Sequence, residues 1–265
     1  MTNTVRLVYP SIFTAFHNVR CAVSTRQGGV SADPYGMNLS FSVGDRKEEV
    51  EENRRRFFAA LRIPSDRLAF PQQHHSANVA VAEEPGAFET TDALVTNRPN
   101  LWLVVTVADC IPLFLVDPGR NVAAVVHAGW KGSVSKITGK TVAVMRDEFG
   151  SVPKDLFAYI GPSAGACCYE VGKEVAEQFE RHVVTSRGTR LYLDLKRENL
   201  NQLASAGLTA SNVEISPDCT ICGSDLFHSY RRDKERSGRM MGVIGIKPMR
   251  DGIMESWKNG EKRSR

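Results

Sequence analysis

Residues 101–133 read LWLVVTVADCIPLFLVDPGRNVAAVVHAGWKGS and contain three apolar runs of strand length, at residues 101–107, 113–117 and 121–127. Only Pro118-Gly119-Arg120 separates the second run from the third, and such residues are typical of a tight turn. We therefore predict an antiparallel β-hairpin here. A hairpin at this place makes the sheet that contains it mixed rather than purely parallel.

The rest of the chain alternates segments of strand and helix periodicity, which predicts a mixed α/β (α+β) fold. Further strands are expected at residues 5–9, 20–24, 78–81, 93–95, 157–160, 212–215 and 240–246. Helices are expected at residues 47–61, 133–149, 172–182 and 194–206. No repeat or linker divides these elements, so we expect one domain over residues 1–265.

The composition is that of an ordinary globular protein, with 42% hydrophobic and 24% charged residues among 265. The net charge is only +4 and the basic residues are dispersed apart from two short runs, residues 54–56 and 262–265, which argues against a nucleic-acid partner. The sequence carries no pattern of a secretion signal or a membrane span. Six cysteines are too few for a disulfide scaffold in a chain of this length, so we predict a reducing, cytoplasmic location.

Metal-ligating residue types lie at the ends of the central apolar runs. Cys110 follows the first run, His127 closes the third, and Gln73-His74-His75 lies upstream. One cysteine with two histidines is a ligand set that holds zinc and leaves one coordination position for chemistry. We choose His75 over His74 because Gln73 and His75 would share one face of a strand. The alternative is that Cys110 is a buried apolar residue and that the histidines are structural.

Two glycine-containing turns are candidate anion sites. Residues 129–133 join the strand that ends at His127 to the next expected helix, where free N–H groups and Lys131 would attract an anion. Residues 24–31 place Arg26 after a strand in the same way. In both places the alternative is a plain turn that needs glycine.

The segment Cys219-Thr220-Ile221-Cys222 has the spacing of half a zinc knuckle or of a redox pair. No second Cys/His pair follows at a suitable spacing, so the signal is weak. Arg231, Arg232 and Arg239 come next, and they either contact a ligand or pair with nearby acidic residues.

Eight motifs, in order over nearly the whole chain, resemble those of the YfiH-type family. They are STRQGGVS (24–31), NL (38–39), QHH (73–75), DALVT (92–96), ADC (108–110), HAGW (127–130), CYEV (168–171) and SYRR (229–232). The family has been called multicopper polyphenol oxidase, laccase domain, peptidoglycan editing factor and purine nucleoside phosphorylase. The resemblance implies a four-layer α/β/β/α fold and assigns the metal to His75, Cys110 and His127. Ser76 stands where the family usually has glycine and Lys131 where it usually has arginine, which argues against a bidentate anion contact at residue 131.

The family names imply different chemistries, and the residues choose among them. A multicopper oxidase needs many histidines, commonly in His-x-His pairs, whereas this chain has six histidines and no such pair, which excludes laccase chemistry of that type. A single copper at the same three ligands stays open, because copper binds most nitrogen and sulfur sites more tightly than zinc does.

The resemblance therefore predicts a zinc-dependent purine nucleoside phosphorylase that splits adenosine, inosine or guanosine into base and ribose 1-phosphate, with adenosine deaminase and methylthioadenosine phosphorylase as further activities. Nucleoside and phosphate would be its small-molecule partners, and the oligomeric state is left open. The residues expected in catalysis are His75, Cys110, His127 and Asp109, with Asp109 moving protons, and those expected to bind substrate are Arg26, Asn38, Gln73 and Lys131.

Three alternatives compete with this interpretation. In a cysteine hydrolase acting on an amide such as a cell-wall peptide, Cys110 would be the nucleophile and His127 the base, with Asp109 nearby. A non-enzymatic binding or editing factor would keep the pocket without turnover. A copper-dependent polyphenol oxidase would use the same three ligands for redox chemistry.

Overall fold

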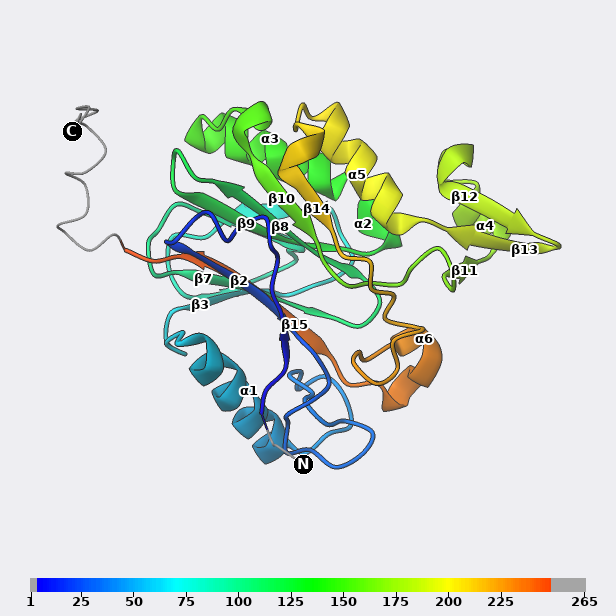
Figure 1. Cartoon of the computed structure of the whole chain (residues 1–265), viewed down its shortest axis with the longest axis horizontal. Coiled ribbons are helices and arrows are strands. Elements are labelled where there is room, and N and C mark those ends of the chain that lie inside the picture. The colour runs from blue at the N-terminus through cyan, green and yellow to red at the C-terminus, as the bar shows by residue number, and fades with distance from the viewer. Residues whose placement is uncertain (1–3, 249–265) are drawn as a thin grey trace, which may run out of the picture.

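Two six-stranded sheets stacked face to face form the centre of the protein in the computed structural model, which describes residues 4–248 (Figure 1). The first sheet has the order β1 (Leu7–Val8), β2 (Val19–Ser24), β15 (Met240–Ile246), β7 (Trp102–Val107), β3 (Leu68–Pro71) and β5 (Gly86–Phe88). The second has the order β14 (Val213–Ile215), β10 (Phe157–Ile160), β8 (Ile111–Asp117), β9 (Val122–Ala128), β6 (Ala93–Thr96) and β4 (Val79–Val81). Both sheets contain parallel and antiparallel pairs, as the mixed fold predicts.

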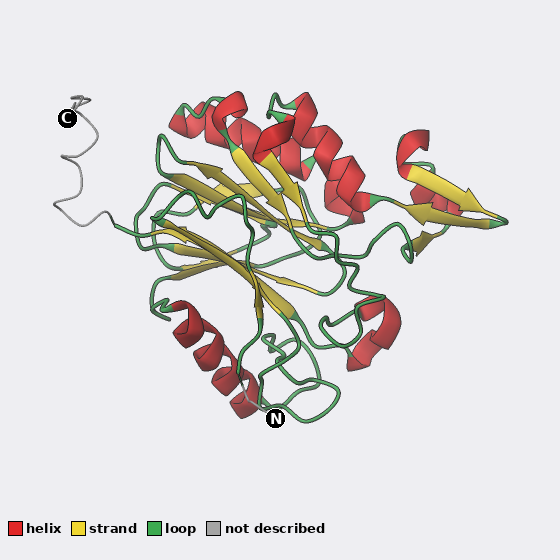
Figure 2. Cartoon of the chain, viewed as in Figure 1, coloured by secondary structure: helices red, strands yellow, loops and turns green. Residues whose placement is uncertain are grey.

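Helices cover the outer face of each sheet (Figure 2). Helix α1 (Lys47–Leu61) lies on the first sheet, while α3 (Ile137–Phe149) and α5 (Leu195–Ser205) lie on the second. The expected four-layer α/β/β/α arrangement is therefore confirmed. The shorter elements are α2 (Trp130–Val134), α4 (Lys173–Ala176), α6 (Tyr230–Asp233), the 3₁₀ turns η1 (Pro153–Asp155), η2 (Arg181–Val183), η3 (Ala210–Asn212) and η4 (Lys234–Arg236), and a small sheet of β11 (Glu170–Val171), β13 (Arg190–Leu193) and β12 (Val184–Arg187).

The central strands are apolar on both faces because each sheet is covered on both sides. Leu103 of β7 and Phe114 of β8 pack between the two sheets, whereas Leu113, next to Phe114, faces α3 and α5. Every residue of β8 and β9 is buried. The continuous apolar runs of the sequence are thus the inner strands of a layered core.

The β8–β9 hairpin is confirmed and sets the position of the functional residues. The Asp117 carboxylate accepts hydrogen bonds from the backbone N–H groups of Gly119 and Arg120, both at 3.0 Å, which closes the turn. The antiparallel register that follows pairs Pro112 with His127. Cys110, which lies just before β8, is therefore brought to the same end of the hairpin as His127.

Two expected helices differ from the structure. The helix expected at residues 133–149 is broken, because Lys136 has a φ of 62° and a right-handed helix cannot pass through that conformation. The helix expected at residues 172–182 is reduced to α4 followed by η2, because the backbone is extended at Glu180, where ψ is 145°. Val175 and Phe179 still pack against the core. The strands β3, β5, β11, β12 and β13 were not expected, and the strand expected at residues 5–9 is cut to β1.

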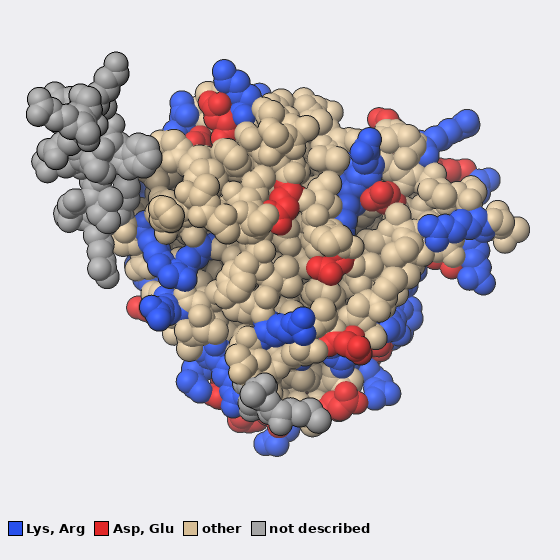
Figure 3. Space-filling view, viewed as in Figure 1, with Lys and Arg blue, Asp and Glu red and all other residues tan. Residues whose placement is uncertain are grey.

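Charged side chains of both signs are interspersed on the face shown in Figure 3, in agreement with the dispersed charge of the sequence. Among residues 4–248, no helix combines the length and the apolar character needed to cross a bilayer. The basic run at residues 262–265 lies outside the described residues.

Candidate active site

His75, Cys110 and His127 lie together, with one ligand atom of each within 4.8 Å of the others. The two imidazole rings meet edge to face, with centroids 4.9 Å apart. His127 belongs to β9 and is buried, Cys110 lies in the turn between β7 and β8, and His75 comes from the segment after β3 and is exposed. Three separate segments thus converge on one point that is open to solvent on the His75 side.

The structure brings His75 rather than His74 to this point, although the argument from strand faces is wrong. Strand β3 ends at Pro71, and His75 has a φ of 58°, in the left-handed region. The backbone turns at His75 and aims its ring toward Cys110, an orientation that strand alternation does not describe.

Asp92 holds this arrangement in place from beneath. Its carboxylate is fully buried and accepts a hydrogen bond from His127 Nδ1–H at 2.8 Å. It also accepts from the backbone N–H groups of His74, His75 and Ser76 and from the Ser76 hydroxyl, at 2.7–3.1 Å. His127 Nδ1 keeps its proton and donates it in the hydrogen bond to Asp92. Nε2 is therefore the nitrogen left to bind a metal.

Burial acts to raise the pKa of Asp92, but the hydrogen bonds from His127 and Ser76 hold it well below the usual range. Sequence reasoning noticed this residue only as part of a motif. A carboxylate directly before a buried strand is a signal that could have identified it as a positioning residue.

Cys110 and His127 stabilise each other's charged forms. Burial acts to raise the pKa of the Cys110 thiol, but the charge of His127 and hydrogen bonds from both histidines lower it to about 6. Burial acts to lower the pKa of His127, yet the Cys110 thiolate and Asp92 raise it to about 9. Both shifts favour the pair of thiolate and imidazolium, and the thiolate is the form that binds metals and attacks electrophiles.

The two glycines beside the three ligands, Gly129 and Gly132, leave little space for a side chain. A Cβ atom at position 129 would lie 3.0 Å from Cys110 Sγ and 3.0 Å from His75 Cδ2, and one at position 132 would lie 2.9 Å from the Ser76 carbonyl oxygen. The turn that starts α2 therefore passes against the ligands. Lys131, the expected anion contact in this turn, is exposed, and its ammonium lies 5.7 Å from the Trp130 ring centroid.

A cavity of about 730 Å³ opens above the three ligands. Two arginines, Arg231 and Arg239, line it together with the rings of Tyr169 and Tyr230. The Arg231 guanidinium lies 5.2 Å from the Tyr169 ring centroid. The Arg239 guanidinium lies 5.5 Å from the Tyr230 ring centroid. The full lining is Ser42, Gln73, His75, Thr106, Ala108, Asp109, Cys110, His127, Trp130, Tyr169, Tyr230, Arg231, Lys234, Glu235 and Arg239.

Asp109 lines the cavity, and its carboxylate is occupied by three donors. It accepts from the Thr220 hydroxyl at 2.6 Å, the Ser229 hydroxyl at 3.0 Å and the Arg231 backbone N–H at 2.6 Å. These bonds fasten the segment before α6 to the turn that carries Cys110.

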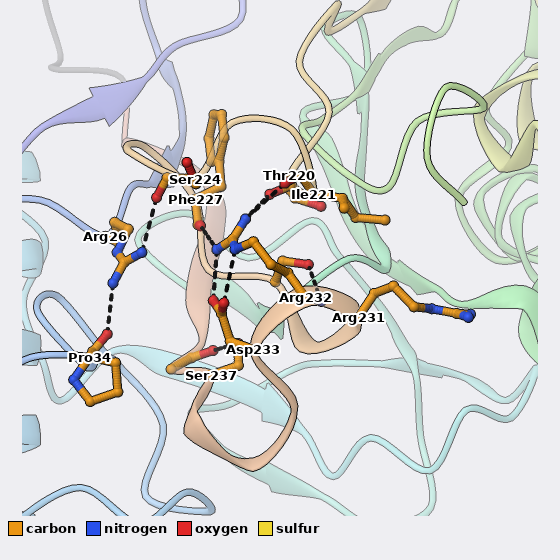
Figure 4. A network of polar contacts seen from close by, with 12 residues as sticks. Arg26, Pro34, Thr220, Ile221, Ser224, Phe227, Arg231, Arg232, Asp233 and Ser237 are labelled. Carbon is orange, nitrogen blue, oxygen red and sulfur yellow. Dashed lines mark hydrogen bonds and ion pairs between the residues drawn. The ribbon is translucent and has the colours of Figure 1, made fainter. Parts of the chain in front are cut away.

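The four residues expected to bind substrate have separate locations. Gln73 lines the cavity, but its side-chain amide is already occupied by the backbone of Thr106. The amide NH₂ donates to the Thr106 carbonyl oxygen and the amide oxygen accepts from the Thr106 N–H, both at 2.8 Å. Arg26 is not in the lining, and its guanidinium donates to the carbonyl oxygens of Ser224 and Pro34 (Figure 4). Asn38 is fully buried and accepts from the Arg239 backbone N–H at 2.9 Å. Lys131 is likewise absent from the lining.

Comparison with known proteins gives a consistent result over most of the chain. Residues 20–247 match the model of the family described as multi-copper polyphenol oxidoreductase laccase. The chain is 41% identical over 248 residues to a protein of Deinococcus radiodurans named purine nucleoside phosphorylase, which covers 92% of this chain and 93% of that one. It is 33% identical over 242 residues to purine nucleoside phosphorylase YlmD of Bacillus subtilis, covering 84% of this chain and 87% of that one.

Solved structures agree with these relatives. The hypothetical protein YfiH of Bacillus licheniformis superposes with a TM-score of 0.85 at 31% identity, covering 92% of this chain and 99% of that one. YlmD from Geobacillus stearothermophilus superposes with a TM-score of 0.83 at 31% identity, covering 89% and 94%.

Proposed function

We propose that this chain, which belongs to the multi-copper polyphenol oxidoreductase laccase family, is a metal-dependent purine nucleoside phosphorylase. The family membership expected from the motifs is confirmed by the match over residues 20–247 and by relatives such as YlmD. The proposal rests on one observation: three metal-ligating side chains and two arginines line the same cavity of about 730 Å³. That volume is in the range of small-molecule sites, and the arginines suit a phosphate.

The donor set fits a single bound metal ion. One thiolate and two imidazole nitrogens are ligands that zinc accepts, provided that His127 loses its Nε2 proton when the ion binds, and Asp92 holds the Nδ1 side of His127 in the way that metal sites commonly require. Copper accepts the same donors. A bound zinc would supply Lewis acidity at this point of the cavity, and we propose zinc as the native ion.

The protein's own side chains would bind and orient the two substrates. In phosphorolysis a phosphate oxygen forms a bond to C1′ of the ribose, the glycosidic bond breaks, and its electron pair leaves with the purine. We assign the phosphate to Arg231 and Arg239, since these cations line the cavity, in place of Arg26 and Lys131, which do not. Aromatic rings such as Tyr169 offer a surface for the base.

Asp109 is proposed as a positioning residue, because its three hydrogen bonds hold the segment that carries Arg231. The same cavity and ligands would serve adenosine deamination and cleavage of methylthioadenosine, which we propose as further activities of the site.

The test is to incubate the purified protein with adenosine or inosine, with and without phosphate, and to identify the products by mass. We expect free base and ribose 1-phosphate only when phosphate is present, and inosine from adenosine if deamination also occurs. Both reactions should be lost in Cys110→Ala. If neither nucleoside is converted by the metal-loaded protein, the proposal is wrong.

Replacing Arg231 with alanine is expected to raise the KM for phosphate roughly 10- to 100-fold, the equivalent of a lost charge-assisted hydrogen bond. The KM for inosine should change little, because the backbone bond from residue 231 to Asp109 is retained. The matched control is Arg55→Ala, since Arg55 is exposed on α1 and pairs with Glu52. A larger effect on inosine than on phosphate would contradict the assignment.

A specific observation also favours a second candidate, a cysteine hydrolase. Cys110, His127 and Asp92 lie in the order of nucleophile, base and orienting carboxylate, although the third member is Asp92 and not the expected Asp109. The two candidates differ in whether the thiolate is free or held by a metal.

Alkylation of Cys110 separates these candidates. We expect Cys110 in the purified protein to resist iodoacetamide at neutral pH and to react only after a chelator has removed the metal, as read from the mass of its peptide. A free thiolate whose pKa is lowered to about 6 would instead react at once. Rapid labelling without chelator, together with cleavage of an amide substrate, would establish the hydrolase.

A further inference from the structure

Four of the six cysteines gather at a second place, apart from the residues that line the active cavity. Cys167 and Cys168 lie in the segment after β10, and Cys219 and Cys222 lie in the segment after β14. Their sulfur atoms are all within 4.8 Å of one another. The expectation that no second pair accompanies the Cys219–Cys222 spacing is therefore wrong, because the partner pair is supplied by the fold from about fifty residues away.

We propose that these four thiolates bind a structural zinc ion, in addition to the metal of the active site. With Zn–S bonds of about 2.3 Å, the sulfur atoms of a tetrahedral site lie about 3.8 Å apart. The structure has Cys168 and Cys222 at 2.9 Å and Cys167 and Cys222 at 3.5 Å, with 4.8 Å as the outer limit of the group. These distances lie on both sides of the tetrahedral value, and small changes of the cysteine rotamers would bring the four sulfur atoms around one ion.

Iron–sulfur clusters and disulfides account less well for the same arrangement. A cluster places two or more irons and bridging sulfides between its four cysteines, which separates the outer sulfurs further than this group allows. A single disulfide joins two sulfurs at about 2.05 Å and leaves the other two thiols without a role. Four cysteines around one ion leave no open position, which is typical of a structural site.

The backbone around the cluster is shaped for thiolates. The N–H group of Gly165 donates to Cys219 Sγ at 3.2 Å, and the N–H groups of Ile221 and Cys222 also bond this sulfur. A Cβ atom at Gly165 would lie 3.2 Å from Cys167 Sγ and 3.3 Å from Cys219 Sγ, so a side chain here would press against both sulfur atoms. Such N–H to sulfur bonds stabilise a coordinating thiolate.

Two cations offset the negative charge that four thiolates and one Zn²⁺ would leave. The Lys196 ammonium donates to the carbonyl oxygens of Ser216 and Asp218, both at 2.7 Å, and interacts electrostatically with Cys219 and Cys167. The Arg187 guanidinium donates to the Cys167 carbonyl oxygen at 3.0 Å. Lys196 of α5 thus contacts the segment that leads to Cys219, and Arg187 of β12 contacts the segment of Cys167.

The zinc would brace one wall of the active cavity without touching substrate. Tyr169, which lines the cavity, directly follows Cys168, and Thr220, within the Cys219–Cys222 turn, donates to Asp109. Arg232 supports the same turn by donating to the carbonyl oxygens of Thr220 and Ile221 (Figure 4). Cross-linking the two segments would therefore fix both Tyr169 in the cavity lining and the Thr220 hydroxyl that donates to Asp109.

Metal analysis of the purified full-length protein and its variants tests the proposal. We expect two zinc ions per chain in the unchanged protein, one in Cys222→Ser, one in His127→Ala, and fewer than one when the two changes are combined. Cys21→Ser is the matched control, because Cys21 is a buried cysteine of β2 outside both groups, and it should keep two. If the unchanged protein holds one zinc ion and Cys222→Ser keeps it, the proposal is wrong. If the unchanged protein holds one zinc ion that Cys222→Ser loses and His127→Ala keeps, the cysteine site is supported and only the metal of the active site is ruled out.

A measurement on the unchanged protein covers the case in which Cys222→Ser fails to fold. Cys167 and Cys222 are exposed, so as free thiols they would be accessible to iodoacetamide and would react with it at alkaline pH, where the thiolates form. We expect peptide mapping to find all four cysteines protected until a chelator is added. Labelling of Cys167 and Cys222 before chelation, or a disulfide between Cys168 and Cys222 in freshly purified protein, would show that no zinc is held there.

Discussion

Replacing His127 with alanine is expected to lower kcat/KM for inosine phosphorolysis by roughly a thousandfold or more. A catalytic metal contributes several kcal/mol to the stabilisation of developing charge, and about 4 kcal/mol corresponds to a thousandfold in rate. The change removes one of three ligands and leaves Cys110 and Asp92 without their shared partner. Steady-state kinetics together with the metal content of the variant check the expectation, and deamination, if present, should fall in parallel.

The control for this change is the pair His75→Ala and His74→Ala. Both histidines are exposed, so neither replacement opens a hole in the core, yet only His75 belongs to the ligand group. His75→Ala should therefore lose activity and metal as His127→Ala does, while His74→Ala stays close to the unchanged protein. Equal losses in the two neighbours, or full activity in His127→Ala, would show that the three residues do not act as one metal site.

The central hairpin was predictable because its signals are local. Two continuous apolar runs flank a turn in which Asp117 accepts hydrogen bonds from the following N–H groups, and the register then follows from the turn. The break between α2 and α3 was not predictable in this way. Helical periodicity continues through residues 133–149, and only the contact of the turn with the loop at Ser76 and the left-handed Lys136 interrupt it.

The candidate site was predictable to the extent that its residues end strands. Cys110 and His127 are side chains at the same end of one hairpin, so sequence position alone brings them together. Asp92 and the cysteine cluster depend on contacts between segments far apart in the chain, 35 residues for Asp92 with His127 and 55 for Cys167 with Cys222. Such pairings are set by how the second sheet and its connecting segments assemble, which no local pattern records.

Replacing Asp92 with asparagine is expected to weaken metal binding about 10- to 100-fold, the usual effect of removing a carboxylate that orients a ligating histidine. The carboxylate accepts five hydrogen bonds while fully buried, and an amide group must turn its NH₂ toward some of those donors. Each buried donor left without an acceptor costs about 1–3 kcal/mol, so stability should fall by roughly 2–4 kcal/mol. Competition with a zinc indicator and urea unfolding measure the two effects.

Asp117→Asn separates a loss of metal orientation from a general loss of stability. Asp117 is as deeply buried as Asp92 and also accepts backbone hydrogen bonds, but it lies at the opposite end of the β8–β9 hairpin from the ligands. This variant should therefore lose stability while keeping the zinc affinity of the unchanged protein. If Asp117→Asn weakened zinc binding as much as Asp92→Asn does, the effect at residue 92 would come from the stability of the sheet, and the hydrogen bond to His127 would have no separate part in holding the metal.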